Sequence, residues 1–243
     1  MTTLAEPDIA KRGADLARAY AGLTGPALLE PLLTRELKGQ IALVSSFGAE
    51  SAVLLHMVAE IDRATPVIFL NTGKLFGETL RYRRDLIARL GLTDAREIKP
   101  LAEAEAANDA DGMLWRRDPD ACCRFRKVEP LERALSGFGA WITGRKRFQA
   151  ATRADLVTIE AADGRLKVNP LADWGRDDLV AYLDRHDLPR HPLEADGYLS
   201  IGCMPCTDRV AAGDDIRSGR WSGMGKTECG IHLPLPAVAA PSV

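Results

Sequence analysis

With 243 residues, the chain is long enough for one large α/β domain or two small ones with substantial cores. A formal net charge of -2 at pH 7 argues against a general attraction to nucleic acid or anionic lipid, so any anion site must be local. No apolar run approaches the roughly 20 residues of a membrane span, and the N-terminus lacks the apolar stretch of a secretory signal, so we expect a cytoplasmic protein.

Apolar residues at helical spacing dominate the first part of the chain. Leu and Ala recur between about Asp8 and Lys38 with an interruption near Gly25-Pro26, which predicts two N-terminal helices. From Ile41 onward, short apolar strands alternate with amphipathic helices, a pattern typical of a mostly parallel, doubly wound α/β sheet. The expected strands are Ile41 to Val44, Val67 to Leu70, Ala95 to Lys99 and Ala140 to Thr143, and the expected helices are Ser51 to Ile61, one ending near Leu90, and Asp177 to His186.

The last third of the chain has a different pattern. Asp163-Gly164 lies between two alternating runs and predicts a β-hairpin at the edge of the sheet. After Pro189, glycine, proline and charged residues dominate, as in loops. We therefore expect an N-terminal helical segment (1–40), a main α/β domain (41–215) and a flexible C-terminal tail (216–243).

Small and polar residues follow two of the expected strands. Ser45 to Ser51 forms a turn before a helix, where backbone N–H groups and the positive helix end can bind an anion. This turn lacks the Gly-Lys-Ser/Thr of a Walker loop, which argues against an ordinary P-loop NTPase. Asn71 to Lys74 follows the next strand, at the sheet edge where open α/β proteins bind ligands. The two loops together favour a nucleotide site, although helix capping and turn chemistry explain each loop taken alone.

Basic residues gather at two later points. The first group follows the expected strand at 140–143 and consists of Arg145, Lys146, Arg147 and Arg153. The second pair, Arg217 and Arg220, would share one face if that stretch were helical. A solvated surface is the usual explanation for such a run. Because guanidinium groups bind phosphate and sulfate bidentately and the whole chain is nearly neutral, we favour anion recognition.

The five cysteines divide into four and one. Cys122 and Cys123 are adjacent, Cys203 and Cys206 form a CxxC pair, and Cys229 stands alone near the C-terminus. Four soft ligands in two pairs indicate a zinc or iron–sulfur site, and a CxxC pair is also compatible with redox chemistry. Adjacent residues project about 100° apart on a helix, which suits a cluster with separate corners slightly better than one small ion. The remaining cysteine indicates a thiol kept free for chemistry.

Seven segments together resemble the assimilatory adenylyl-sulfate reductases, which are relatives of the phosphoadenylyl-sulfate reductases. The segments are SSFGAES, NTGKLFGET, CCRFRKVEPL, TGRKRFQ, IGCMPCT, DIRSGRW and KTECGIH. The resemblance runs from about Ile41 to His232, so only the N-terminal helices and the end of the tail lie outside it. It implies a Rossmann-like sheet of the adenine-nucleotide α-hydrolase kind.

The resemblance also implies a reaction. Adenosine 5′-phosphosulfate would be reduced to sulfite and AMP in the pathway to cysteine, with thioredoxin or a similar dithiol protein as the electron donor. Cys229 would be the nucleophile and would carry an S-sulfocysteine intermediate. The other four cysteines would bind a [4Fe–4S] cluster. Family members that use only the 3′-phosphorylated substrate typically lack these four ligands, so their presence favours the unphosphorylated substrate.

The predicted substrate site combines the loops and the basic residues. Lys127 matches the family's lysine after the cysteine pair and would place positive charge between cluster and substrate; His232 would assist Cys229 or seat the tail. The predicted substrate-binding residues are Ser46, Phe47, Gly48, Ala49, Glu50, Ser51, Asn71, Thr72, Gly73, Arg145, Lys146, Arg147, Arg153, Arg217 and Arg220.

Three alternatives stay open. One is a phosphoadenylyl-sulfate reductase. Another is an ATP-dependent adenylyltransferase or pyrophosphatase of the same fold, with a four-cysteine zinc site and no role for Cys229. The third is a cluster-bearing regulator that is not an enzyme and never becomes sulfonated at Cys229. We expect no nucleic-acid or membrane partner, and a homo-oligomer stays open.

Overall fold

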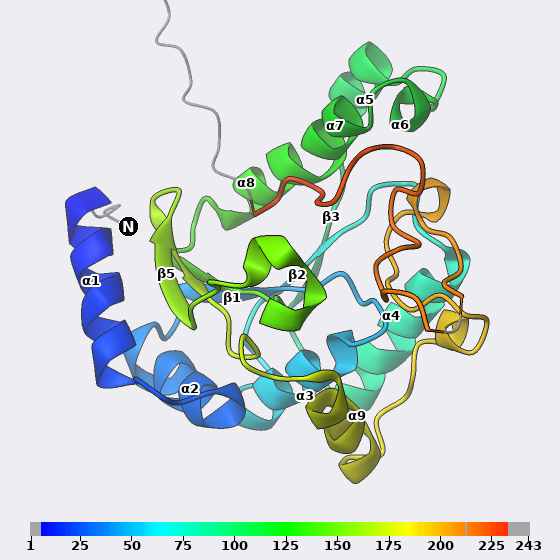
Figure 1. The fold of residues 1–243 in the computed structure, drawn as a ribbon. Helices are drawn as coiled ribbons and strands as arrows, with labels where there is room; N and C mark the ends of the chain where they lie inside the picture. Colours follow the sequence, from blue (N-terminus) through cyan, green and yellow to red (C-terminus); the bar gives the residue numbers. More distant parts are fainter. Residues whose placement is uncertain (1–5, 212, 233–243) are drawn as a thin grey trace, which may run out of the picture.

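A six-stranded sheet forms the centre of the molecule, with helices on both of its faces (Figure 1). The computed structural model describes residues 6–211 and 213–232. The strand order is β3-β2-β1-β4-β6-β5, and every neighbouring pair is parallel except β5 with β6. The strands are β1 (Ile41–Val44), β2 (Val67–Leu70), β3 (Ala95–Ile98), β4 (Ala140–Ile142), β5 (Ile159–Ala162) and β6 (Arg165–Val168). The predicted mostly parallel sheet and its edge hairpin are confirmed.

The order of the strands reverses once, between β1 and β4. Helices α3 (Ser51–Ile61) and α4 (Gly77–Leu90) connect β1 to β2 and β2 to β3, so these three strands follow one another across the sheet. The chain then returns through α8 (Glu129–Leu135) to place β4 on the free side of β1, where Ile41 pairs with Ala140. Loops after β1 and β4 therefore leave the sheet in opposite directions, which opens a crevice at the carboxyl ends of these strands.

Alternation along the strands builds two cores, one on each face. Leu43 of β1 and Phe69 of β2 face a large core formed with α1 (Glu6–Ala19), α2 (Gly25–Pro31), α3, α4 and α9 (Arg176–Arg185). Ala42, Ile68 and Trp141 point the other way and pack against α8. Because successive side chains of a strand alternate between faces, a strand with both faces covered is apolar throughout, as the sequence pattern indicates.

The N-terminal helices belong to the large core. α1 (Glu6–Ala19) contacts the edge strand β5, and its Ile9 and Leu16 are buried in the same cluster as the main sheet. The predicted interruption at Gly25-Pro26 is the start of α2 (Gly25–Pro31). Pro26 lies in the first turn of this helix, where a missing N–H is tolerated. The segment predicted as residues 1–40 thus forms helices that share one core with the α/β domain.

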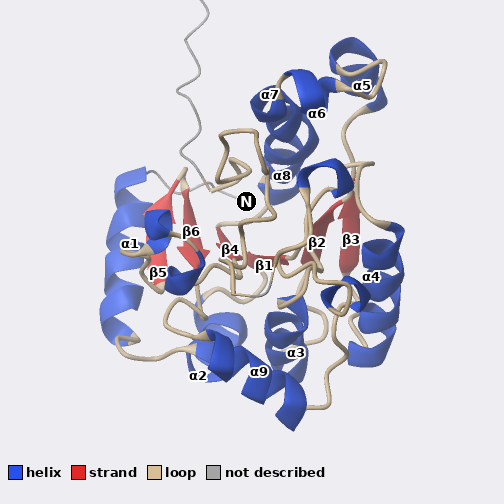
Figure 2. Cartoon of the chain, turned by 45° about the vertical axis from the view of Figure 1, so that its right-hand side comes forward, coloured by secondary structure: helices blue, strands red, loops and turns tan. Residues whose placement is uncertain are grey.

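Helices between β3 and β4 were not anticipated from the sequence. They are α5 (Ala102–Asn108), α6 (Leu114–Arg117), α7 (Pro119–Cys123) and, after a π-helical turn at Arg124–Val128, α8. Figure 2 shows α5, α6 and α7 beyond the ends of the strands. Within the part of the chain that the structure describes, none of the helices is both long enough and apolar enough to cross a membrane.

One buried histidine makes the stability of this fold sensitive to pH. His191 is 1% exposed; its Nε2 lies 3.1 Å from Thr79 Oγ1, and its Nδ1 accepts the N–H of Leu193 at 3.2 Å. Burial lowers the pKa of His191 to about 4. Protonation therefore favours the unfolded chain, so the stabilising contribution is complete above about pH 6.5 and is lost as the pH falls towards 4.

We expect wild-type protein to lose about 2 kcal/mol of unfolding free energy through this group between pH 7.5 and pH 5. Urea unfolding of wild type and His191→Asn at both pH values isolates the effect, because other titrating groups are common to both proteins. An equal pH dependence in the two proteins would contradict the assignment to His191.

Candidate active site

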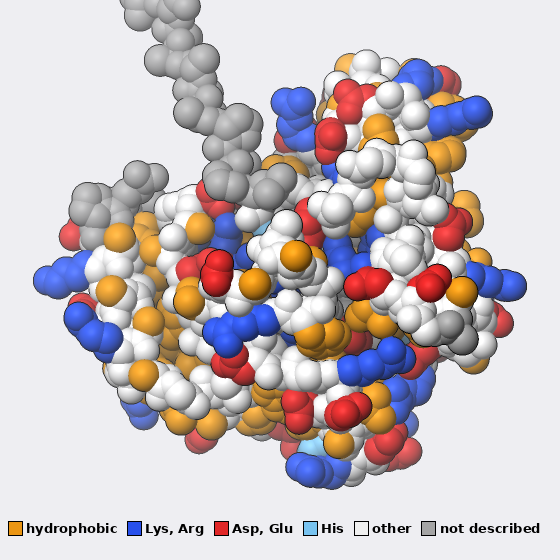
Figure 3. Space-filling model, viewed as in Figure 1, with side chains coloured by type: hydrophobic (Ala, Val, Ile, Leu, Met, Phe, Trp, Pro, Cys, Tyr) orange, Lys and Arg blue, Asp and Glu red, His pale blue; other side chains and the backbone are white. Residues whose placement is uncertain are grey.

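A cavity with a volume of about 220 Å³ opens at the carboxyl ends of β1 and β4, in the crevice where the strand order reverses. It is lined by the loop after β1, the loop after β4, residues 199–201 and two segments of the C-terminal tail. On the face shown in Figure 3, Lys and Arg side chains are interspersed with Asp and Glu. The cations that line the cavity are therefore a local feature of the crevice.

The loop after β1 is anchored by an inward-pointing aromatic side chain. Phe47 has a left-handed backbone (φ 50°), is fully buried, and packs edge-on against Phe69 with ring centroids 5.5 Å apart. A non-glycine residue in this conformation is strained, and here the core packing offsets the strain. Gly48 passes so close to Ile201 that an added Cβ would lie 3.2 Å from its carbonyl oxygen. Phe47 shapes the loop from beneath, whereas the other predicted residues of this loop line the cavity.

Five of the six predicted basic residues line the cavity, and several of them are paired with acidic groups. Lys146 Nζ donates to Glu50 Oε2 at 2.7 Å and to the Gly144 carbonyl at 3.0 Å. Arg145 pairs with Glu160. The residues that line the cavity are Arg145, Lys146, Arg153, Arg217 and Arg220, whereas Arg147 pairs with Asp173 outside it.

Glu228, the residue before the lone cysteine, binds two of these arginines. Arg153 donates from Nε and Nη2 to the two carboxylate oxygens of Glu228, both at 2.9 Å, and Arg217 Nη2 lies 3.3 Å from Glu228 Oε2. A bidentate guanidinium–carboxylate pair has the geometry that also suits a phosphate or sulfate. The Glu228 carboxylate therefore occupies an anion-binding position on two arginines that line the cavity, and it seats the tail next to Cys229.

His232 holds the other end of this tail segment. Its ring stacks on Trp141 with centroids 5.3 Å apart and an interplanar angle of 3°. Burial, together with the nearby Arg145 and Arg153, lowers the pKa of His232 well below its ordinary value, so the imidazole is neutral. Its Nδ1 is buried and has no hydrogen-bond partner among the described residues. The described part of the tail is thus packed on the body; residues 233–243 of the predicted flexible tail lie outside the described residues.

The four paired cysteines converge beside the main cavity. Their thiols are free, and the residues are 6–8% exposed. Cys122 and Cys123 end α7, whose first turn is capped by Asp118 through the N–H groups of Asp120 and Ala121. The CxxC pair forms a tight 3₁₀ turn, in which the N–H of Cys206 bonds to the carbonyl of Cys203 at 3.0 Å. All four line one small cavity together with Lys74, Trp115, Pro119, Arg126, Lys127 and Pro205.

Burial favours the protonated form of three of these thiols. It raises the pKa of Cys122 to about 11 and also raises the pKa of Cys123 and Cys206. Burial opposes the charge of Lys127, but the negative charge that the nearby cysteines carry when deprotonated, Cys203 first among them, outweighs burial and raises the pKa of the ammonium. Four buried soft donors beside a cation fit a thiolate-bound metal–sulfur centre. Within the described residues, no three His, Cys, Asp or Glu side chains surround a point that could hold one metal ion, so a single zinc would require them to move.

Cys229 packs beside the CxxC pair and directly follows Glu228, which binds two of the cavity arginines. It is half-buried and packs against the cluster formed by Cys203, Cys206 and Trp221. Arg220, which lines the main cavity, donates to the Cys206 carbonyl at 3.3 Å and lies over the Trp221 ring. The structure therefore brings the lone thiol close to both sites.

The loop after β2 does not line the main cavity, although its residues were predicted to bind substrate. Asn71 Nδ2 donates to Glu97 at 3.0 Å, and Thr72 Oγ1 lies 3.2 Å from Cys203 Sγ. The reason is the strand order, because the crevice lies between β1 and β4 rather than between β1 and β2. Residues that line the cavity but were not singled out include Trp141, Thr143, Gln149, Leu199, Ser200 and Ile201. Of these, Thr143, Gln149 and Ile201 stand within quoted sequence motifs, and Trp141 stands within an expected strand.

The sheet, the switch-point cavity and the loop before α3 define an α/β protein of the adenine-nucleotide α-hydrolase-like fold. A phosphoadenylyl-sulfate reductase from Candida auris, solved as a phosphate complex, is similar in structure with a TM-score of 0.69 and 27% identity, over 86% of this chain and 99% of that one. Yeast FAD synthetase, at 15% identity and a TM-score of 0.52 over 83% of this chain and 75% of that one, shares the fold alone.

Residues 40–209 match the phosphoadenosine phosphosulfate reductase domain, and the chain belongs to this family. It is an oxidoreductase of sulfate assimilation. The adenosine 5′-phosphosulfate reductase of Mesorhizobium japonicum is 53% identical over 94% of this chain and 90% of that protein. The phosphoadenosine 5′-phosphosulfate reductase of Gloeobacter violaceus is 41% identical over 89% of this chain and 92% of that protein.

Proposed function

We propose that this protein reduces adenosine 5′-phosphosulfate to sulfite and AMP, using Cys229 as the nucleophile. The observation that carries the proposal is the position of Cys229 next to Glu228, whose carboxylate occupies the cavity arginines Arg153 and Arg217. An anion bound to those arginines would lie near the lone thiol. A phosphosulfate is such an anion, and its sulfur is an electrophile.

The chemistry divides into two displacements. The Cys229 thiolate attacks the sulfur of the phosphosulfate. A bond forms between Cys229 Sγ and the sulfonate sulfur, and the bond from that sulfur to the bridging phosphate oxygen breaks, releasing AMP. A thiolate of a dithiol protein such as thioredoxin then attacks Cys229 Sγ and releases sulfite. Its second thiol resolves the mixed disulfide, so the donor leaves oxidised and Cys229 is a thiolate again. Both electrons come from the donor.

The cavity residues have roles that follow from their chemistry. The loop after β1 offers backbone N–H groups at the start of α3, and the arginines offer bidentate donors. The neutral His232, stacked on Trp141, can donate one hydrogen bond to the sulfonate. Cys122, Cys123, Cys203 and Cys206 would hold a [4Fe–4S] cluster, which when bound would supply structural support and an electrostatic field beside the site.

A second substrate has a specific observation in its favour. The Gloeobacter violaceus relative is named for the 3′-phosphorylated nucleotide and is 41% identical to this chain. The four paired cysteines and the adenosine 5′-phosphosulfate reductases among the relatives favour the unphosphorylated substrate. Competition between the two nucleotides in one reaction decides the preference.

The proposal is tested with each nucleotide carrying labelled sulfur. Without a dithiol, the protein should acquire at most one label per chain and release an equal amount of AMP. Addition of reduced thioredoxin should then convert the label to sulfite. A protein that acquires no label, and instead exchanges pyrophosphate into ATP, would support an adenylyltransferase and contradict the reductase.

Glu228 competes with substrate for Arg153 and Arg217, so its charge should weaken binding. In a Cys229→Ser background, which prevents turnover, Glu228→Gln is expected to bind adenosine 5′-phosphosulfate about tenfold more tightly, because one opposing charge is removed from a half-buried site. Titration calorimetry measures the change, with exposed Asp214→Asn as the matched control. Unchanged or weaker binding would contradict competition by this carboxylate.

A further inference from the structure

One arginine is buried beside the paired cysteines, away from the substrate cavity. Arg126 lies on the π-helical turn that directly follows Cys122 and Cys123, and it is 2% exposed. Three to four residues separate it from the cysteines, so its backbone is held to theirs by one continuous helical segment. A fully buried guanidinium requires several partners to replace its lost hydration.

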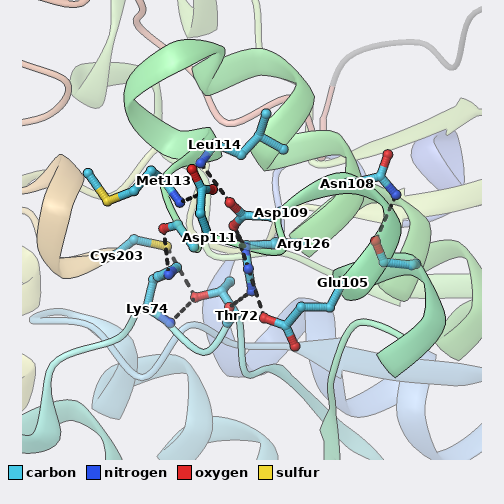
Figure 4. Close-up of polar contacts among 12 residues, drawn as sticks. Thr72, Lys74, Glu105, Asn108, Asp109, Asp111, Met113, Leu114, Arg126 and Cys203 are labelled. Atoms are coloured by element: carbon cyan, nitrogen blue, oxygen red, sulfur yellow. Dashed lines mark hydrogen bonds and ion pairs between the residues drawn. The ribbon is translucent and has the colours of Figure 1, made fainter.

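Its partners come from two other parts of the chain (Figure 4). Nε and Nη2 donate to Asp109 Oδ2 at 3.2 and 2.6 Å, and Nη2 lies 2.8 Å from Glu105 Oε1. Nη1 donates to the backbone carbonyl of Thr72 at 2.7 Å. The Asp109 side chain is itself buried and accepts the N–H of Leu114 at 2.7 Å, where α6 begins. The guanidinium thus joins the end of α5, the start of α6 and the loop after β2.

The loop after β2 in turn contacts the second cysteine pair. Thr72 Oγ1 lies 3.2 Å from Cys203 Sγ, and the carbonyl of Lys74 accepts the N–H of Met204 at 2.7 Å. Lys74 Nζ donates to the Gly112 carbonyl at 2.8 Å, which ties the same loop to the segment between α5 and α6. A continuous path of covalent and hydrogen-bonded contacts therefore leads from Cys123 through Arg126 and Thr72 to Cys203.

We propose that Arg126 is a positioning residue that sets the distance between the two cysteine pairs. The two pairs are some 80 residues apart in sequence and lie on different elements, so their relative position depends on contacts of this kind. The loop at Thr72 to Lys74 then helps to hold the cysteine pairs in position, because it contacts both Arg126 and the second pair. The inference deepens the proposed function and rests on its metal–sulfur centre.

Three variants test the role. Arg126→Lys keeps the charge beside Asp109 but cannot span the carboxylate and the Thr72 carbonyl together. Arg126→Met with Asp109→Leu removes the buried charge pair as a unit, so the protein should fold, but it still lacks the bond to Thr72. Arg124→Lys, on the exposed side of the same turn, is the matched control.

The readouts are iron and sulfide per chain, the visible spectrum, and the rate at which a chelator removes iron. Both Arg126 variants should release iron at least about tenfold faster than wild type, as expected when a residue that orients metal ligands is lost. Arg124→Lys should match wild type. His191→Asn, which weakens the fold elsewhere, should also release iron at the wild-type rate, and this separates positioning from general stability.

Two failures can be told apart. If wild-type protein purified anaerobically contains no iron, the metal–sulfur centre is wrong and this inference is overturned with it. If wild type contains iron and the Arg126 variants release it at the same rate, the inference alone is overturned, and the proposed function stands.

Discussion

Cys229→Ser is expected to lower sulfite formation by about 10⁴-fold or more while leaving nucleotide binding within a few-fold of wild type. A serine hydroxyl is a far weaker nucleophile than a thiolate. An ester formed at serine would have oxygen in place of Sγ, so the donor thiolate could not form a mixed disulfide there and the second displacement would be blocked. The measurements are steady-state sulfite release with thioredoxin, protein-bound label without it, and calorimetric binding of substrate.

The controls separate Cys229 from the rest of the tail and from the other thiols. Exposed Ser222→Ala lies on the same tail and should keep wild-type activity. Iron content of Cys229→Ser should equal that of wild type, because this cysteine is outside the paired set. If Cys229→Ser still acquires sulfonate label and reduced thioredoxin releases that label as sulfite, one of the paired cysteines, with the CxxC pair first in line, is the nucleophile.

The local features of the fold could be predicted from the sequence because they depend on short-range patterns. β1, β2 and α3 have the bounds expected from their apolar spacing, and Asp163-Gly164 forms the hairpin turn. Helices α5 to α7 were missed, since two of them are shorter than six residues and none offers a long amphipathic period. Their positions depend on buried contacts such as the one between Asp109 and Arg126, which no local pattern reveals.

The position of the site depends on strand order, which is a tertiary property. Consecutive loops after β1 and β2 were expected to share a ligand, but β4 pairs with the free side of β1 and moves the crevice there. Phe47 was assigned to substrate because it stands among small loop residues, whereas its side chain is in the core. Glu228 was overlooked, since a single acidic residue beside a cysteine has no distinctive spacing.

Cys206→Ala is expected to reduce iron from about four atoms per chain to well below one, because a [4Fe–4S] cluster needs a ligand at each corner and alanine supplies none. Sulfite formation should fall with it, since Cys229 packs against Cys203, Cys206 and Trp221 and loses part of that support. Iron and sulfide analysis with the visible spectrum measures the first effect, and the thioredoxin-coupled assay measures the second.

The comparison of Cys206→Ala with Cys229→Ser separates metal binding from sulfite formation. Cys206→Ala should lack the metal, whereas Cys229→Ser should keep the metal but lose sulfite formation. The two thiols lie close together, so this contrast shows that their roles differ. A colourless wild-type protein that contains zinc would contradict the cluster, and Cys206→Ala would then lose zinc instead. If Cys206→Ala keeps a full complement of iron, Cys206 is not a ligand, and the pairing of the adjacent cysteines with the CxxC turn is wrong.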